Sequence, residues 1–285
     1  MKDKWWCDST RELQSVADTK NAKKFFSELK TLYGPSSKGT GPLFDLDGHT
    51  VIKEPTLITE RWAQHFNQLL DRQSTISEDA IAEVPQTPVI KELNKPSTLD
   101  ETIKAIKQMS SGKAPGEVGI PTEVYKYGGD ELAAELTRLF KELWAEGEVP
   151  QDFKDALIIH LYKNKGDRRL FDNHRGISLL SNAGNIFARV IINCLTTHLD
   201  STFPESQCGF RSGRGTTDML FAARQVQEKC REQNLDLYMV FVYLTKTFDP
   251  VSREGLWKLL LKAGCPPRVV KITRSFHDGE DGTCI

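Results

Sequence analysis

The sequence has almost no net charge, no cysteine pairing pattern and no long apolar run. Its 38 Lys and Arg residues balance 39 Asp and Glu residues, which leaves a net charge of -1. A protein that coats nucleic acid by bulk attraction carries a large positive charge, so any nucleic-acid contact of this chain must be local. The six cysteines form no C-x-x-C pair and no cluster with histidine, which gives no support to a zinc site or a disulfide framework.

The lack of an apolar run also bears on location. The N-terminus MKDKWWCDSTRE has no signal-peptide core, and the most apolar segment, residues 176–200, is interrupted by Asn182, Asn185, Arg189 and Asn193. We therefore expect no membrane contact, reduced thiols and an intracellular protein, in the nucleus or the cytoplasm. The composition, with 39% hydrophobic and 27% charged residues, is ordinary for a globular chain, and 285 residues can form one large domain or two smaller ones.

Residues 1–95 are predicted to form a mainly helical N-terminal region. Apolar positions at Phe25, Phe26, Leu29 and Leu32 predict a helix over 9–33 that ends before Gly34-Pro35. Asp47-Gly48 lies between two short apolar runs, which is typical of a hairpin over residues 42–52.

A second helix is predicted over residues 59–70, with Thr59 as its N-cap and Trp62, Phe66 and Leu69 on one face. His65 lies beside this stripe, and we interpret it as structural. The polar, proline-containing segment 71–97 is interpreted as a linker, which places a domain boundary near residue 95.

The rest of the chain mixes helices and strands. A capping box, Thr98 to Glu101, opens a helix that runs to about Met109. The later elements are a loop at 111–121, a helix at 130–145, a strand at 156–162, a basic loop at 163–169, helices near 182–200 and 216–233, a strand ending at Leu244, and a helix at 250–263.

Four segments, in order, resemble the reverse transcriptases of non-LTR (LINE-type) retrotransposons. They are GKAPGEVGIPTEVYK at 112–126, DNHRGISLLSNAGNIFARVI at 172–191, ESQCGFRSGRGTTDML at 205–220 and FVYLTKTFDPV at 241–251. The N-terminal part, including WWCDSTRELQSVADTKNAKKFF and RWAQHFNQLL, is similar to the region between endonuclease and polymerase in such elements. The resemblance thus covers nearly the whole chain.

The resemblance implies an α+β fold, a partial right-hand polymerase preceded by the helical N-terminal region. Residues 96–235 would belong to the fingers and residues 236–285 to the start of the palm. The intact family is an RNA-directed DNA polymerase that acts on an RNA template and a DNA primer. It uses two Mg²⁺ ions roughly 3.5 to 4 Å apart, held by carboxylates. One of these carboxylates aligns with position 243, and the others come from a later Asp-Asp hairpin.

The sequence departs from the family pattern at these metal ligands. Position 243 is Tyr, and a tyrosine hydroxyl is neutral at pH 7 and a poor ligand for a hard cation. Asp249 lies six residues further on, up to ~20 Å along an extended strand, so it cannot replace the lost carboxylate. We interpret Asp249 as the N-cap of the next helix, with Pro250 at its first position.

The sequence also departs from the family pattern at positions other than 243. The sequence ends at Ile285 before any Asp-Asp pair, and Val118 stands where the family has an Asp. The acidic cluster Asp278, Glu280, Asp281 has glycines around it and is interpreted as a frayed tail. Phe248 aligns with the residue that blocks a ribonucleotide's 2′-hydroxyl, although a core aromatic is an equal alternative. We expect a truncated, inactive fragment that retains no Mg²⁺, with residues 236–285 poorly packed.

The basic residues of the fingers remain. Arg175 matches the family arginine that meets the triphosphate of the incoming nucleotide, a role that suits a planar guanidinium. Residues 163–175 carry a local charge of +3, to which Lys163 and Lys165 contribute. Arg211 and Arg214 lie in a glycine-rich turn that lets backbone and guanidinium approach a phosphate together.

Three hypotheses remain open at this stage. The chain is an inactive polymerase fragment, or a residual nucleic-acid-binding module, or a protein-interaction module that uses residues 1–95. The last requires the Trp62 and Phe66 stripe to be exposed.

Overall fold

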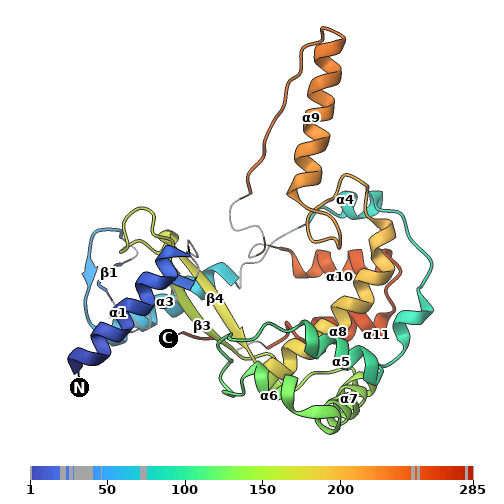
Figure 1. Ribbon diagram of the computed structural model, residues 1–285. Coiled ribbons are helices and arrows are strands. Elements are labelled where there is room, and N and C mark those ends of the chain that lie inside the picture. Colours follow the sequence, from blue (N-terminus) through green and yellow to red (C-terminus); the bar gives the residue numbers. More distant parts are fainter. Residues whose placement is uncertain are drawn as a thin grey trace.

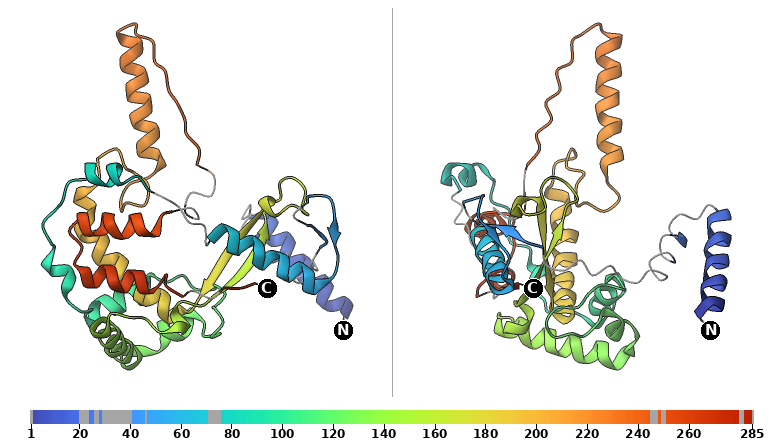
Figure 2. Two further views of the ribbon diagram at one scale, coloured as in Figure 1. Left: turned by 180° about the vertical axis from the view of Figure 1, so that it is seen from behind. Right: turned by 90° about the vertical axis from the view of Figure 1, so that its left-hand side faces the viewer.

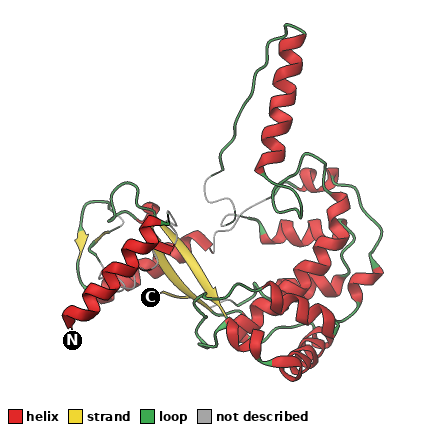
Figure 3. Ribbon diagram, viewed as in Figure 1, coloured by secondary structure: helices red, strands yellow, loops and turns green. Residues whose placement is uncertain are grey.

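The computed structural model describes residues 2–19, 24, 25, 28, 41–45, 47–70, 76–244, 248, 251–279 and 282–284. Within them the architecture is α+β, as predicted (Figures 1 and 3). The described residues form two separate hydrophobic cores, one among helices and one under a small sheet.

The larger core is helical. Its helices are α5 (Leu99–Gln108), α6 (Thr122–Tyr127), α7 (Gly129–Glu146), α8 (Asn182–Leu199), α10 (Arg253–Lys262) and α11 (Pro267–Ser275). Phe140 of α7 and Phe187 of α8 stack at 4.8 Å between ring centroids, and both are almost completely buried. Ile272 of α11 is also fully buried, so the C-terminal helices belong to the same core as α7 and α8.

The smaller core lies under a three-stranded sheet of order β4-β3-β5. Strand β3 (Ala156–Tyr162) pairs antiparallel with β4 (His174–Leu180) and parallel with β5 (Gly282–Cys284). Helix α3 (Pro55–Leu70) and the hairpin of β1 (Leu43–Phe44) and β2 (Val51–Ile52) contribute the other side of this core. The N-terminal region is therefore packed against the strands that follow it.

Several elements have the bounds that the sequence predicts. The strand at 156–162, the helices at 130–145, 182–200 and 216–233 and the hairpin around Asp47-Gly48 are confirmed by β3, α7, α8, α9 (Thr216–Glu232) and the β1–β2 pair. The capping box is also confirmed, because Thr98 accepts from the Glu101 amide at 3.3 Å and Glu101 accepts from the Thr98 amide at 2.8 Å.

Three predicted helix starts are wrong. Helix α3 begins at Pro55, whose fixed φ suits the first helical position, and Thr59 donates to the Pro55 carbonyl at 3.1 Å inside the helix. Helix α10 is capped by Ser252, whose hydroxyl accepts from the Gly255 amide at 3.2 Å, so Asp249, outside the described residues, is not its cap.

The first helix, α1, spans Lys2–Asp18 rather than 9–33, and it stands apart from the sheet in the side view of Figure 2. Of the predicted apolar face only Phe25 is described, and Phe26, Leu29 and Leu32 lie outside the described residues.

The predicted strand ending at Leu244 is also wrong. Residues 235–244 form an extended connection without a strand assignment, and Val240, Phe241 and Val242 are 87%, 87% and 78% exposed. A strand needs a partner for its backbone groups, and this segment returns beside α9, which projects as an arm with no buried residue (Figures 1 and 2).

The segment interpreted as a linker contains α4 (Glu78–Glu83) and the short helix η1 (Lys91–Asn94). The Thr87 amide donates to the Lys262 carbonyl and the Ile90 amide to the Gly264 carbonyl, both at 2.8 Å. The segment therefore packs on α10. The expected poor packing of residues 236–285 is wrong for the helices, because Trp257 of α10 is 6% exposed.

The remaining short elements are η2 (Gln151–Phe153), η3 (Phe171–Asn173) and η4 (Asp200–Thr202). Of the acidic cluster read as a tail, Asp278 accepts from Arg274 Nε at 3.3 Å, while Glu280 and Asp281 lie outside the described residues. In the described part, no helix is long and apolar enough to cross a membrane.

The loop at 111–121 is docked by a close backbone contact. A Cβ on Gly116 would lie 2.6 Å from the Leu180 carbonyl carbon and 2.9 Å from the Ser181 nitrogen. The loop is also held by Asn182, whose Nδ2 donates to the Ile120 carbonyl at 2.7 Å. We predict that Gly116→Ala destabilises the protein by about 1 to 3 kcal/mol, because backbone must move. Urea denaturation measures this.

The matched control is Gly215→Ala, since a Cβ there meets no atom within 4 Å and the φ of -166° suits alanine. Equal losses from both substitutions would contradict the docking of the loop.

Amide exchange tests the packing of the C-terminal half. We predict fast exchange in residues 236–244, whose backbone is exposed, and slow exchange in α7 and α11, whose apolar faces are buried. Fast exchange throughout α11 would show that the helical core does not include it.

Candidate nucleic-acid interface

The two faces of the β3–β4 hairpin have different surroundings. Because partners across the strands share a face, His160, Tyr162, His174 and Gly176 point to the inner side, toward α3. Trp62 stacks on His160 at 4.2 Å between ring centroids and meets His174 edge-on at 4.9 Å. Trp62 and Phe66 are only 3% and 4% exposed, which contradicts the expectation of an exposed stripe for protein binding.

Gly176 makes this packing possible. A Cβ at this position would lie 2.4 Å from Cε1 of Phe66, so no larger side chain fits without moving the buried ring. The glycine of HRGIS therefore has a packing role that the sequence did not reveal, since its φ is not one that requires glycine.

The opposite side of the hairpin is called the outer face. It is formed by Leu157, Ile159, Leu161, Arg175, Ile177 and Leu179. Leu161 is 50% exposed and Ile177 is 37% exposed. Arg175, opposite Leu161 in the register, is also exposed. Its guanidinium makes no hydrogen bond or ion pair within the part of the chain that the structure describes, so its N–H donors face solvent.

The basic loop at 163–169 is folded by its own hydrogen bonds. Asn173 Nδ2 donates to the Asp167 carbonyl at 2.7 Å, and the Tyr162 hydroxyl donates to the Gly166 carbonyl. Asn164 and Gly166 have φ angles of 54° and 74°, the left-handed region in which these residue types are tolerated. The loop is therefore held by hydrogen bonds to Tyr162 of β3 and to Asn173, which directly precedes β4.

His174 ties this loop to the inner face. Its Nε2 lies 2.7 Å from the Arg168 carbonyl and donates to it, while the buried Nδ1 has no hydrogen-bond partner among the residues that the structure describes. Burial lowers the pKa of His174, because the charged ring would lose its hydration. The neutral ring with its proton on Nε2 fits the contact with the Arg168 carbonyl, because a carbonyl oxygen only accepts.

Not every cation of the loop is available. Arg169 forms an ion pair with Asp167 at 2.7 Å, and its guanidinium lies 4.4 Å from the Phe44 ring centroid. Lys163 Nζ donates to the Asp172 carbonyl at 2.8 Å and forms no ion pair with a carboxylate of the described residues. Lys165 is exposed near the tip. Lys163, Lys165 and Arg175 thus present positive charge at this end of the hairpin.

The structure gives Arg211 an internal role. Its side chain is 9% exposed, with Nε 2.9 Å from Asp200 Oδ1. Its terminal nitrogens donate to Asp200 Oδ2 and to the carbonyls of Asp200, Pro204 and Gln207 at 3.1 to 3.3 Å. All five N–H donors are used within the chain, so Arg211 folds the loop and has no donor left for a phosphate.

Arg214, Phe248 and Tyr243 lie elsewhere on the surface. Arg214 forms an ion pair with Glu205. Phe248 is 70% exposed, so it is not a core aromatic, and its ring meets that of Phe210 edge-on at 5.6 Å. Tyr243 is 90% exposed. The structure therefore gathers Arg175, Lys163 and Lys165 on the hairpin, and separates Arg211, Arg214 and Phe248 from them in other loops.

The described residues do not fit the two-metal site of the resembled family. They contain no group of three or more His, Cys, Asp and Glu side chains placed to hold a metal. Position 243 brings a neutral phenol in place of a carboxylate.

Comparison with known proteins supports the resemblance. A family model described as "Reverse transcriptase (RNA-dependent DNA polymerase)" matches residues 162–282. The "Transposon TX1 uncharacterized 149 kDa protein" of Xenopus laevis is 30% identical over 271 residues, 93% of this chain and 20% of that protein. The "RNA-directed DNA polymerase from mobile element jockey" of Drosophila melanogaster is 30% identical over 183 residues, 63% of this chain and 20% of that protein.

A third relative is the "Retrovirus-related Pol polyprotein from type-1 retrotransposable element R1" of Bradysia coprophila. It is 26% identical over 225 residues, 72% of this chain and 22% of that protein. The chain thus spans about a fifth of the length of these relatives.

Arg211 can be tested as a structural residue. We predict that Arg211→Ala lowers the melting temperature by several degrees, whereas Arg224→Ala, at an exposed position of α9, leaves it unchanged. Differential scanning calorimetry at pH 7 measures both.

The stabilisation that Arg211 gives to the fold should depend on pH, because its partner Asp200 is titratable. The hydrogen bond from Arg211 lowers the pKa of Asp200, so the stabilisation is complete above the ordinary aspartate pKa and is lost as the pH falls below about 4. The difference between wild type and Arg211→Ala should shrink in that range. A difference that stays constant down to the acid limit would assign the effect to packing alone.

Proposed function

Because the chain belongs to the reverse transcriptase family of non-LTR retrotransposons, we propose that it forms the fingers and the start of the palm of an RNA-directed DNA polymerase. Residues 96–235 would be the fingers part and residues 236–285 the palm part. In this proposal the chain binds an RNA template paired with a DNA primer through the outer face and the basic loop at 163–169. It does so without polymerising.

The observation that carries the proposal is the free guanidinium of Arg175. Arg169, Arg211 and Arg214 each have a carboxylate partner within 4 Å, whereas Arg175 has none among the described residues. An arginine that needs no partner for folding keeps its five donors for phosphate oxygens, which it can bind in pairs. Lys163 and Lys165 add charge at the same end of the hairpin.

The apolar side chains of the outer face support the same proposal. Leu161 and Ile177 flank Arg175 on adjacent register positions and are substantially exposed. A nucleotide presents an apolar ring or sugar face beside a phosphate, so a surface that combines aliphatic side chains with a guanidinium suits it. Neither a protein core nor an ordinary solvated face requires this combination.

The proposed loss of catalysis rests on position 243. The family mechanism needs anionic oxygen ligands for two metals, and Tyr243 provides none. The 285 residues also contain no Asp-Asp pair. We therefore propose that this chain holds no catalytic Mg²⁺ of its own.

Binding to a template-primer tests the role of Arg175. Few phosphates are contacted, so we predict a shallow salt dependence, with a slope of about -3 to -4 in log affinity against log salt. Arg175→Ala should cost about 1.5 to 3 kcal/mol, tenfold or more in dissociation constant. Arg231→Ala, which removes the same charge from the exposed α9, should change little.

Fluorescence anisotropy with a labelled RNA:DNA hybrid measures these affinities, and circular dichroism confirms that both variants fold. Equal effects from Arg175→Ala and Arg231→Ala would show that the attraction is diffuse and would remove the support for this interface.

Primer extension tests the loss of catalysis. We predict no nucleotide incorporation by the purified chain with Mg²⁺ or Mn²⁺ on a primed RNA template. Tyr243→Asp should restore nothing, since one carboxylate cannot hold two metals. Template-dependent extension by either protein would contradict the proposal.

A further inference from the structure

The extended segment 238–244, which follows α9, is apolar and uncovered. Its sequence, YMVFVYL, contains no charged residue, proline or glycine. The exposed fraction of its side chains runs from 49% at Met239 to 90% at Tyr243. Because side chains alternate along an extended chain, both sides of the segment are apolar and exposed. A short segment of this composition and exposure readily pairs with another strand.

The backbone of this segment is unpaired as well. Residues 236–243 make no hydrogen bond with any residue that the structure describes. The Leu235 amide, just before them, still donates to the Cys230 carbonyl at 2.8 Å at the end of α9. The segment therefore offers a row of backbone N–H and C=O groups to another chain.

Helix α9 runs beside the segment and is also uncovered (Figures 1 and 2). Met219, Leu220, Phe221 and Val226 are between 47% and 66% exposed. A two-stranded ribbon alone is marginally stable in water, but it becomes stable when it packs against a helix. A second strand paired with the segment would therefore find a helix to pack on in the same chain.

The exposed area is close to that of a stable interface. Phe221, Tyr238, Phe241 and Tyr243 are between 64% and 90% exposed. Since an aromatic side chain can bury about 150 to 250 Å², these four residues offer roughly 500 to 800 Å² per chain. A standard interface buries about 800 Å² per partner. The aliphatic side chains between the aromatic ones add to this area, so a partner of ordinary size is accommodated.

We propose that two copies of this chain form a dimer by antiparallel pairing of residues 238–244 around a twofold axis at Phe241. Leu237 is half-buried, so the exposed run begins at Tyr238, and its middle residue is Phe241. A twofold pairing uses the same edge of both chains and closes at two copies. The β3–β4 hairpin takes no part in it, so the dimer does not depend on the proposed nucleic-acid interface.

The segment is its own complement in this register. Phe241 faces the partner's Phe241, and Val240 faces the partner's Val242, so like apolar side chains meet across the strands. Met239 faces the partner's Tyr243, and a thioether packs favourably on an aromatic ring. No charged group is buried by the pairing, because the segment carries none.

Sedimentation velocity of the full chain tests the association. Interfaces of this size have dissociation constants in the micromolar range or below, so the chain is measured from about 0.1 to 100 μM. We expect a reversible change from one chain to two as the concentration rises, and no larger species.

A matched pair of lysine substitutions tests the segment. Phe241→Lys should raise the dissociation constant of the dimer at least about hundredfold, because the twofold axis sets two lysines opposite each other in place of two rings. Leu235→Lys adds the same charge at a 59% exposed position three residues before the segment. It should change the dissociation constant less than about twofold.

Two double variants test the register. In Met239→Lys/Tyr243→Asp, each lysine faces the partner's aspartate in the proposed pairing. In Val240→Lys/Tyr243→Asp, the same two charges face apolar residues. Opposite charges across an antiparallel pair stabilise it, so the first variant should dimerise about fivefold more tightly than the second.

Amide exchange locates the interface in the unmodified chain. About half of the amides of 238–244, those that bond across the strands, should exchange more slowly as the protein concentration rises. The fast exchange expected for residues 236–244 is that of the single chain. Slow exchange in α7 should stay the same at every concentration, because α7 belongs to the helical core.

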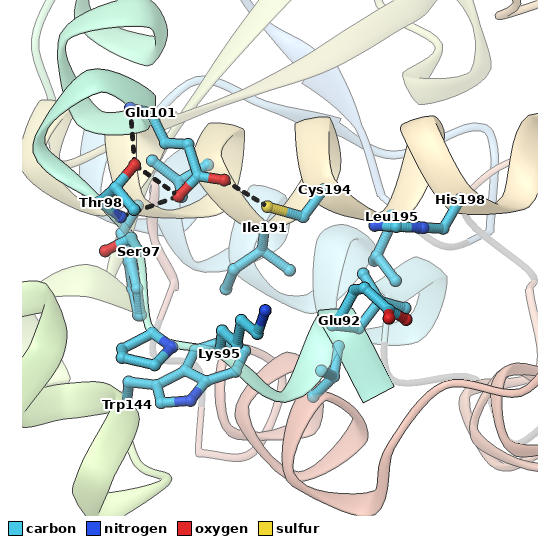
Figure 4. A pocket seen from close by; sticks show the side chains of 15 residues that line it. Glu92, Lys95, Ser97, Thr98, Glu101, Trp144, Ile191, Cys194, Leu195 and His198 are labelled. Carbon is cyan, nitrogen blue, oxygen red and sulfur yellow. Dashed lines mark hydrogen bonds between the residues drawn. The ribbon is translucent and has the colours of Figure 1, made fainter. Parts of the chain in front are cut away.

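Cys194 of α8 reports whether each variant keeps the helical core. Its thiol donates to Glu101 of α5 at 3.7 Å, as Figure 4 shows. Burial raises the pKa of Cys194 to about 11, so little thiolate is present at pH 7 and alkylation is slow. Slow alkylation of Cys194 in a variant therefore means that a loss of dimer is not a loss of fold.

Four results would overturn the proposal. They are a chain that stays single at the highest concentration, growth beyond two chains, a dimer that Phe241→Lys leaves intact, and equal affinities of the two double variants. The first would mean that a different protein or segment covers residues 238–244. If Phe241→Lys unfolds, exchange in the unmodified chain decides, since concentration-independent exchange in 238–244 excludes this interface.

Discussion

The packing of Trp62 against the inner face of the β3–β4 hairpin is the interaction on which the candidate interface depends. Its ring lies against His160, Phe171 and His174, with centroid distances of 4.2, 4.6 and 4.9 Å. Because side chains alternate along a strand, covering one face decides which residues form the other. A shift of one residue in β4 would bury Arg175 and expose His174 and Gly176. The N-terminal region thus fixes the register of the strands that carry the proposed phosphate contact.

The sequence predicted the elements whose signal is local. Helices α7 and α8 have long apolar stripes, and the Thr98 capping box marks the start of α5. The helical spacing of apolar residues and the capping residues were therefore enough to predict these helices. Strand β4 was missed because HRGISLL contains a glycine and an arginine without clear alternation. Its status as a strand comes from pairing with β3. The opposite error occurred at residues 239–244, where β-branched and aromatic residues suggest a strand that finds no partner in the described chain.

The same contrast separates the arginines of the candidate site. Arg175, Arg211 and Arg214 all match family motifs, and sequence patterns cannot distinguish an arginine that folds a loop from one that faces solvent. The distinction depends on partners that only the fold brings close, such as Asp200, eleven residues before Arg211. The packing role of Gly176 was hidden for the same reason, since Phe66 lies far from it in sequence. A family motif therefore identified the region, and tertiary contacts decided which of its cations are available.

Hydroxyl-radical footprinting with and without an RNA:DNA hybrid tests the central claim most directly, because it reports the solvent access of individual side chains. Leu161 and Ile177 on the outer face should become less reactive when the hybrid binds. Met219 and Phe221 on the exposed arm of α9 are 47% and 64% exposed and should keep their reactivity. Protection of Met219 and Phe221 with no change at Leu161 and Ile177 would contradict the assignment of the outer face as the nucleic-acid interface.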